Sequence, residues 1–204
     1  MKKKFTKNIF SDRDAYDMSC PEFVGEHIAK SLAQFKTAVE LCCATGMIVV
    51  QLAKHLKSAC GVDIIPSRIE DAKKNAVLYG VEERTNFIVG DALDPDLLKS
   101  LPADVAILDP EWNMQGVNPP THANNIDDTQ PSTREMFNLT KRYITPNVVI
   151  KIPKSFTFET LSEFGQCRIE NIIWDGNLRF KLAYFLNNIA KNQEMDIFLI
   201  NYCL

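Results

Sequence analysis

One stretch, residues 37–47 (TAVELCCATGM), constrains the fold more than any other. Residues 37–41 are predicted to form a buried strand, small residues follow at 42–46, and an apolar helix pattern runs from 48 to 56. A strand, a tight turn and a helix in this order are typical of a nucleotide-binding unit. The motif alone is weak, because Cys42 and Ala44 stand where glycines are usual and only Gly46 remains. An ordinary α/β turn is the alternative interpretation.

Strands and helices alternate along the rest of the chain. Further strands are predicted at residues 59–64, 84–89, 103–109 and 147–152, with helices at 21–35, 67–80, 96–100, 132–144 and 157–163. Three last strands, at 168–174, 180–186 and 197–202, follow turns typical of antiparallel hairpins. We therefore expect an α/β fold whose mostly parallel seven-stranded sheet has helices on both faces and ends in an antiparallel hairpin.

The division of the chain follows from the same pattern. Residues 1–36 are expected to form an N-terminal segment, irregular to residue 20, and a helix opened by Pro21 with Ser19 as its cap. Residues 37–204 are expected to form the catalytic domain. Residues 111–130 lack any period and are rich in Asn, Pro and Thr. A stretch of this length without secondary structure is usually functional or mobile, so a lid is an open possibility.

Composition excludes several classes of protein. No apolar run reaches the roughly 18 residues that a membrane helix needs, and no signal core follows the basic start MKKKFTKNIF. Six cysteines without a Cys-x-x-Cys pair predict buried thiols in a reducing cytoplasm, or in the nucleus of a eukaryote. Three scattered histidines predict no metal site. The net charge of −3 argues against a broad nucleic-acid surface. Two local basic groups stay open, either as phosphate contacts or as a solvated tail and helix end: Lys2, Lys3, Lys4, Lys7 and Arg13, and Lys141, Arg142, Lys151 and Lys154.

Four successive predicted strands end in an acid, namely Glu40, Asp63, Asp91 and Asp109. In such sheets the ligand binds outside the carboxyl ends of the strands, where these side chains would meet. Asp63 would accept from ribose hydroxyls, Asp91 from the adenine amine, and Glu40 from the ammonium of an amino-acid tail. NAD needs a glycine-rich turn for its pyrophosphate, which Cys42 and Ala44 crowd. The pattern therefore favours S-adenosylmethionine, which has no phosphate.

The fourth acid opens the sequence Asp109-Pro110-Glu111-Trp112. The Asp109 carboxylate and a carbonyl of the rigid proline turn can both accept from one planar amine, which would orient its nitrogen toward a methyl donor. Trp112 would stack on the base that bears the amine, a contact worth roughly 1–3 kcal/mol. The alternative interpretation is a turn with Trp112 buried in the core.

These segments resemble the class I S-adenosylmethionine-dependent methyltransferases and, more narrowly, the RNA cap guanine-N2 methyltransferase (trimethylguanosine synthase) family. The resemblance covers residues 9–185 and rests on VELCCATGM, on GVDIIPSRIEDAKKNAVLYGVEERTNFIVGDAL, on DPEW, on FNLTKRYITPNVVIKIPK and on LRFKLAYF. It implies a Rossmann-like fold and N-methylation of a guanine in RNA, an activity of class EC 2.1.1. The oligomeric state stays open.

The resemblance also implies roles for single residues. The cofactor-binding set would be Glu40, Cys43, Ala44, Gly46, Asp63, Ile64, Asp91 and Ala92, helped by residues 16–21. The catalytic set would be Asp109, Pro110 and Trp112, and the substrate-binding set Glu111, Trp112 and Lys154. Two departures stand out. Glu111 replaces a proline and adds a negative charge beside the substrate, and the residues after Trp112 are Asn113-Met114-Gln115 instead of Gly-Gly-Pro.

Three other functions remain open from the sequence. The same cofactor site would serve methylation of a small-molecule or protein amine. The altered glycine turn and Glu111 also fit a family member that binds RNA without turnover. A nucleotide-dependent dehydrogenase is the most distant alternative, because its cofactor carries a pyrophosphate.

Overall fold

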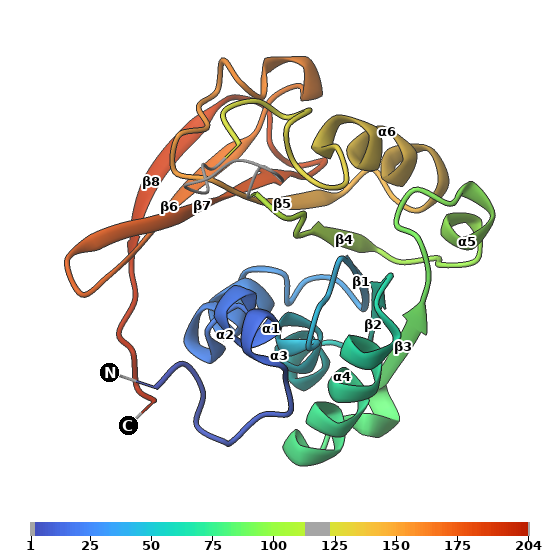
Figure 1. Cartoon of the computed structure of the whole chain (residues 1–204). Coiled ribbons are helices and arrows are strands. Elements are labelled where there is room, and N and C mark those ends of the chain that lie inside the picture. Colours follow the sequence, from blue (N-terminus) through green and yellow to red (C-terminus); the bar gives the residue numbers. More distant parts are fainter. Residues whose placement is uncertain (1–2, 113–122, 204) are drawn as a thin grey trace.

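The computed structural model describes residues 3–112 and 123–203, which form one sheet flanked by helices (Figure 1). The strand order is β3-β2-β1-β4-β5-β7-β6-β8. The strands are β1 (Thr37–Leu41), β2 (Ser58–Asp63), β3 (Thr85–Val89), β4 (Val105–Leu108), β5 (Val148–Ile152), β6 (Arg168–Trp174), β7 (Asn177–Phe185) and β8 (Gln193–Phe198). The helices are α1 (Arg13–Met18), α2 (Glu22–Ser31), α3 (Met47–His55), α4 (Pro66–Tyr79), α5 (Pro95–Lys99) and α6 (Thr133–Tyr143), with 3₁₀ turns at Glu82–Arg84 and Ser162–Phe164.

The predicted α/β class and the C-terminal hairpin are confirmed. Strand β7 runs antiparallel to both β5 and β6, and the other strand pairs are parallel. The hairpin closes at Asp175-Gly176, whose φ angles of 51° and 71° are those of a primed turn. The sheet therefore has the form of an open α/β sheet with one reversed strand.

The number of strands and the last strand differ from the prediction. In the part of the chain that the structure describes, all eight predicted strands join one sheet, which was expected to have seven, and the last strand, β8, begins four residues before the predicted 197–202. It also pairs parallel with β6, whereas an antiparallel arrangement was expected. The reason is topological. Both edges of β7 are already occupied by β5 and β6, so the returning chain pairs with the outer edge of β6 and runs opposite to β7.

Side chains alternate between two cores, one on each face of the sheet. In β4, Val105 and Ile107 belong to the core that α2, α3 and α4 cover, while Ala106 and Leu108 belong to the core that α5 and α6 cover. Figure 1 shows these two groups of helices on either side of the sheet. Because successive side chains of a strand point to opposite faces, Glu40 and Asp109 fall on the α2–α3 face.

The N-terminal segment is more ordered than predicted. Residues 13–18 form α1, and Ser19 ends this helix; α2 begins after Pro21 without a side-chain cap. The Ser19 hydroxyl donates to the Ala15 carbonyl at 2.6 Å and lies 2.6 Å from the hydroxyl of Thr45. The N-terminal segment therefore contacts the turn after β1 through the Ser19–Thr45 hydrogen bond. The boundary expected at residue 36 stays a prediction.

Among the described residues, no helix has both the length and the apolar character needed to span a membrane.

Candidate functional site

The turn after β1 has the backbone conformation of a glycine-rich turn, although Cys42 and Ala44 replace two of the usual glycines. Cys42, Ala44 and Gly46 have φ angles of 66°, 45° and 73°, all in the left-handed region. For residues other than glycine this conformation costs roughly 1–2 kcal/mol each, and such strain is concentrated at functional sites. Hydrogen bonds hold the turn: the Cys43 N–H donates to the Val62 carbonyl at 2.9 Å, and the Ala44 N–H to Asp63 Oδ2 at 2.8 Å. The apparently degraded motif therefore adopts the backbone conformation of a tight glycine-rich turn.

A cavity of about 690 Å³ opens at the carboxyl ends of the central strands. Most of the residues predicted for the site line it: Glu40, Cys43, Ala44, Asp63, Ile64, Asp91, Ala92, Asp109, Pro110, Glu111 and Trp112. From the N-terminal segment, residues 17–21 also line it, whereas Tyr16 does not. Among the described residues, Gly46 and Lys154 are outside this lining, and Lys154 is exposed. Asn113-Met114-Gln115, which depart from the family pattern, lie outside the described residues, as does most of the segment considered as a lid.

Asp63 and Asp91 face one end of this cavity. Asp63 is 6% exposed, and its two oxygens accept the N–H groups of Ala44 at 2.8 Å and Ile65 at 3.0 Å. Asp91 is exposed, and its Oδ1 accepts from the Leu93 N–H at 2.8 Å. A carboxylate oxygen has more than one lone pair, so both side chains can accept further hydrogen bonds from a ligand. This end of the cavity is suited to a ligand that donates hydrogen bonds.

Glu40 lies deeper, 2% exposed, and its Oε2 accepts from the Val49 N–H at 3.2 Å, in the first turn of α3. Burial raises the pKa of its carboxyl well above the usual 4.5, and the negative charge of Asp109 adds to the shift. Glu40 therefore holds a proton more tightly than a carboxyl in water does.

This pKa predicts how Glu40→Gln changes stability. Between pH 4.5 and its raised pKa, Glu40 holds a proton in the folded state that it releases on unfolding, so it makes the folded state less stable as pH rises. The glutamine variant does not titrate. We expect its Tm without ligand to equal that of the wild type near pH 4.5 and to exceed it by about 2–4 °C near neutral pH. Thermal unfolding at a series of pH values measures this difference, and a pH-independent difference would contradict it.

Asp109 forms a buried ion pair that the sequence did not predict. The Lys151 ammonium lies 2.9 Å and 2.8 Å from the two Asp109 oxygens, and Lys151 is only 8% exposed. Burial raises the pKa of Asp109, and the nearby ammonium opposes this shift without cancelling it. Burial, the largest single effect, would lower the pKa of Lys151, but the nearby acidic groups, Asp109 first, and the hydrogen bonds to Asp109 together outweigh it, so the pKa is raised.

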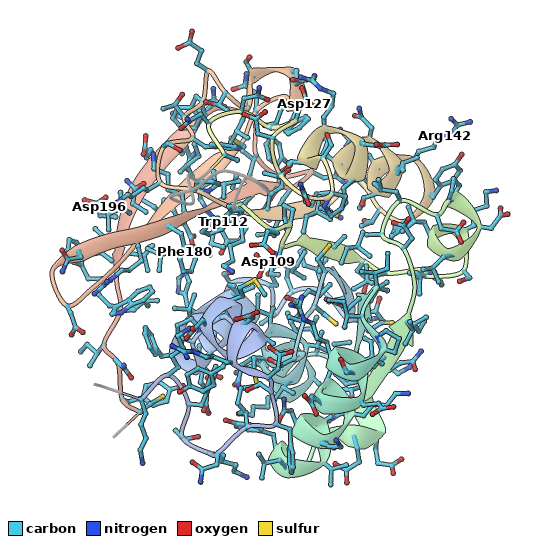
Figure 2. The ribbon with its side chains drawn as sticks, viewed as in Figure 1. Asp109, Trp112, Asp127, Arg142, Phe180 and Asp196 are labelled. Carbon is cyan, nitrogen blue, oxygen red and sulfur yellow. The ribbon has the colours of Figure 1, made fainter. Side chains whose placement is uncertain are left out.

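Trp112 is partly buried and remains part of the cavity lining, so it is not sealed in the core. Its Nε1–H donates to the Lys151 carbonyl at 3.2 Å, and its ring lies 6.0 Å from that of Phe180, centroid to centroid. Figure 2 shows Asp109, Trp112 and Phe180 gathered between the strands and the N-terminal helices. Indole, carboxylate and ammonium thus meet at the second end of the cavity.

Sequence reasoning assigned no role in this cavity to many of its lining residues, of which Lys151 is the most informative; others include Lys4, Arg68, Trp174 and Phe180. A signal existed for Lys151, which is a single charge within the apolar strand VVIKI. A lysine inside a central strand is buried and needs a partner. Leu108 pairs with Ile150 in the β4–β5 register, so the next position pairs Asp109 with Lys151. No signal in the sequence pointed to Trp174 and Phe180, because no residue of the predicted hairpin was expected to reach the site.

Among the described residues, no three His, Cys, Asp or Glu side chains converge as a metal site.

Relatives of this chain are methyltransferases by name. An uncharacterized RNA methyltransferase of Clostridium acetobutylicum is 42% identical over 71 residues, which is 33% of this chain and 15% of that protein. The chain thus spans only a small part of such relatives. A solved putative methyltransferase of Porphyromonas gingivalis has a TM-score of 0.69 at 13% identity, over 93% of this chain and 44% of that one.

The Salinibacter ruber RNA methyltransferase, solved with S-adenosyl-L-homocysteine, has a TM-score of 0.51 at 16% identity, over 83% of this chain and 95% of that one. At such identities the likeness concerns the fold alone, which is the predicted Rossmann-like methyltransferase fold. The family model described as "Methyltransferase domain" matches residues 34–163, which is more than half of the sequence. The chain belongs to this methyltransferase domain family.

Proposed function

We propose that this chain transfers the methyl group of S-adenosylmethionine to an exocyclic amine of a nucleobase in RNA, with guanine N2 as the first candidate. One observation carries the proposal. A single cavity is lined by hydrogen-bond acceptors at the ends of β1, β2 and β3 and, at the end of the next strand of the sheet, β4, by the group Asp109-Pro110-Glu111-Trp112. The first set suits an adenosine with an amino-acid tail, and the second suits a flat ring that bears an amine.

The residues present fit this cofactor. Each Asp63 oxygen already accepts one backbone N–H and has room for one ribose hydroxyl. Asp91 would accept from the adenine amine, and Glu40, ionised by the approach of the cofactor's ammonium, would hold the amino-acid tail. A volume of about 690 Å³ lies within the range of small-molecule sites. The cofactor would supply an electrophilic methyl group on sulfur.

On the acceptor side, the ion pair defines what Asp109 does. Two hydrogen bonds from Lys151 fix the carboxylate and favour its ionised form. Asp109 therefore acts as an oriented acceptor for an amine N–H, which points the nitrogen toward the methyl donor. The same ion pair weakens Asp109 as a base, so the proton that the amine loses passes to water. Trp112 holds the plane of the base.

RNA as substrate is supported by the printed names of the relatives, and guanine N2 by the resemblance to the trimethylguanosine synthase family. A second candidate is a small-molecule amine. Acids predominate in the cavity lining, with Asp17, Glu40, Asp63, Asp91, Asp109 and Glu111 against Lys4, Arg68 and Lys151. A cavity lining with this excess of acidic residues repels the phosphate groups of an RNA strand. A cytoplasmic location likewise remains a proposal.

The experiment is transfer of tritiated methyl from S-adenosylmethionine to separate pools of RNA, DNA, protein and small-molecule amines. We expect label in RNA, recovered as N2-methylguanosine after digestion to nucleosides. Trp112→Ala should lower transfer about 10–100-fold by loss of stacking, with cofactor affinity unchanged. Phe198→Ala, which alters an exposed ring on β8, is the control and should retain full activity. Label confined to small molecules supports the second candidate, and bound cofactor without any transfer contradicts both.

A further inference from the structure

The acceptor end of the cavity contains the parts of a cation-binding site. A carboxylate, Asp109, lies beside two aromatic rings, Trp112 and Phe180, whose centroids are 6.0 Å apart. A desolvated acid next to aromatic faces is a general means of binding a ligand with a fixed positive charge. Taken without Lys151, this arrangement would attract a cationic ring.

Lys151 occupies that position itself. Its Nζ lies 2.8 Å and 2.9 Å from the Asp109 oxygens, 5.0 Å from the Trp112 ring centroid and 5.4 Å from that of Phe180. The same ammonium thus meets all three anchors of the cation site. Within the part of the chain that the structure describes, its hydrogen-bond acceptors are the two oxygens of this one carboxylate.

The side chain cannot withdraw easily. Lys151 lies on β5 between β4 and β7, and it is 8% exposed. Its backbone carbonyl accepts from Trp112 Nε1 at 3.2 Å, so strand and indole are also joined. A cationic ligand would have to displace a buried, paired ammonium, or lie beside it and experience its repulsion.

We propose that Lys151 is a specificity-determining residue, which fills the cation site with the protein's own charge and restricts the acceptor end to uncharged rings. This inference rests on the proposed function and deepens it. It names the class of substrate as a neutral base that bears an amine, such as guanine. A base with a fixed positive charge, such as the 7-methylguanine of an RNA cap, is discriminated against, so the inference separates this chain from the cap substrate of the family that it resembles.

The experiment measures binding to protein saturated with S-adenosylhomocysteine, by quenching of tryptophan fluorescence. The probes are GMP and 7-methyl-GMP, which differ in the fixed charge of the ring. For the wild type we expect GMP to bind at least about tenfold more tightly. In Lys151→Met, Asp109 and both rings become available to a cation. The Kd of 7-methyl-GMP divided by the Kd of GMP should therefore fall at least about tenfold.

Lys181→Met is the matched control. Lys181 is also 8% exposed on a central strand, but its Nζ donates to the Phe156 carbonyl and to Glu194, away from the cavity lining. Its Kd ratio should equal that of the wild type. Because Lys151→Met leaves Asp109 unpaired and could fail to fold, the double variant Lys151→Met/Asp109→Asn removes both charges. For this double variant, the Kd of 7-methyl-GMP divided by the Kd of GMP should fall to about one-tenth of its wild-type value or less. Circular dichroism checks that the variant is folded.

The outcomes separate this inference from the proposed function. A wild-type preference for 7-methyl-GMP, an unchanged ratio in both Lys151 variants, or no binding of any nucleotide or quinoline probe would overturn the inference. Quinoline and N-methylquinolinium form a second pair of probes, which reads the same charge preference without nucleotide recognition. If no methyl enters nucleic acid but quinoline is preferred over its cation, the proposed function fails and the inference stands. If RNA is methylated but neither pair of probes shows a preference for the neutral ring, the proposed function stands and the inference fails.

Discussion

Replacing Asp63 by alanine is expected to weaken binding of S-adenosylhomocysteine at least about 100-fold. The proposed contacts are two ribose hydroxyls that donate to one charged group, and each hydrogen bond to a charged acceptor contributes about 1.5–3 kcal/mol. A tenfold loss of affinity corresponds to about 1.4 kcal/mol. Isothermal titration of the wild type and the variant measures this loss directly. Equal affinities would remove Asp63 from the cofactor site.

Asp63 also supports the strained turn, so the experiment needs a measure of folding. Its Oδ2 accepts from the Ala44 N–H, and Oδ1 from the Ile65 N–H. We expect Asp63→Ala to lower the free energy of unfolding by about 1–3 kcal/mol as well, because an amide in the turn loses its partner. Asp94→Ala is the matched control, because Asp94 is exposed after β3, caps α5 and is not among the described residues that line the cavity.

Much of the site was predictable because one rule acts on many residues at once. Parallel strands bring their carboxyl ends to one edge, so acids at or just after the ends of β1, β2, β3 and β4 must share that edge. Glu40, Asp63, Asp91 and Asp109 were predicted on this ground, and all four line one cavity. The roles assigned to them stay predictions. No comparable rule applied to Lys154, which was assigned by resemblance and is outside the cavity lining among the described residues.

What the sequence did not predict depends on pairings between distant segments. Asp109 and Lys151 become neighbours only when the β4–β5 register is known. Trp174 and Phe180 reach the cavity because β7 inserts between β5 and β6. The turn after β1 was interpreted as degraded, because a glycine is usual wherever φ is positive. Here hydrogen bonds from the flanking elements hold Cys42 and Ala44 in that conformation instead.

The second large effect is expected for Asp109→Ala, which should abolish methyl transfer and lower the free energy of unfolding by about 3–5 kcal/mol. The destabilisation arises from Lys151, which would remain buried without a counter-ion. The double variant Asp109→Ala/Lys151→Met removes that ammonium and should recover most of the stability but none of the transfer. Urea unfolding of the wild type, both single variants and the double variant gives the coupling energy.

The pH dependence of this loss distinguishes an unpaired charge from a cavity left by the smaller side chain. Without Asp109, burial would lower the pKa of Lys151 below its unfolded value, because the carboxylate that raises it is gone. The folded variant would then bind fewer protons than the unfolded chain, so its stability rises with pH. The deficit of Asp109→Ala relative to the wild type should therefore shrink between neutral and alkaline pH. A deficit that is constant over this range would mean that packing, and not the stranded ammonium, is what Asp109 provides.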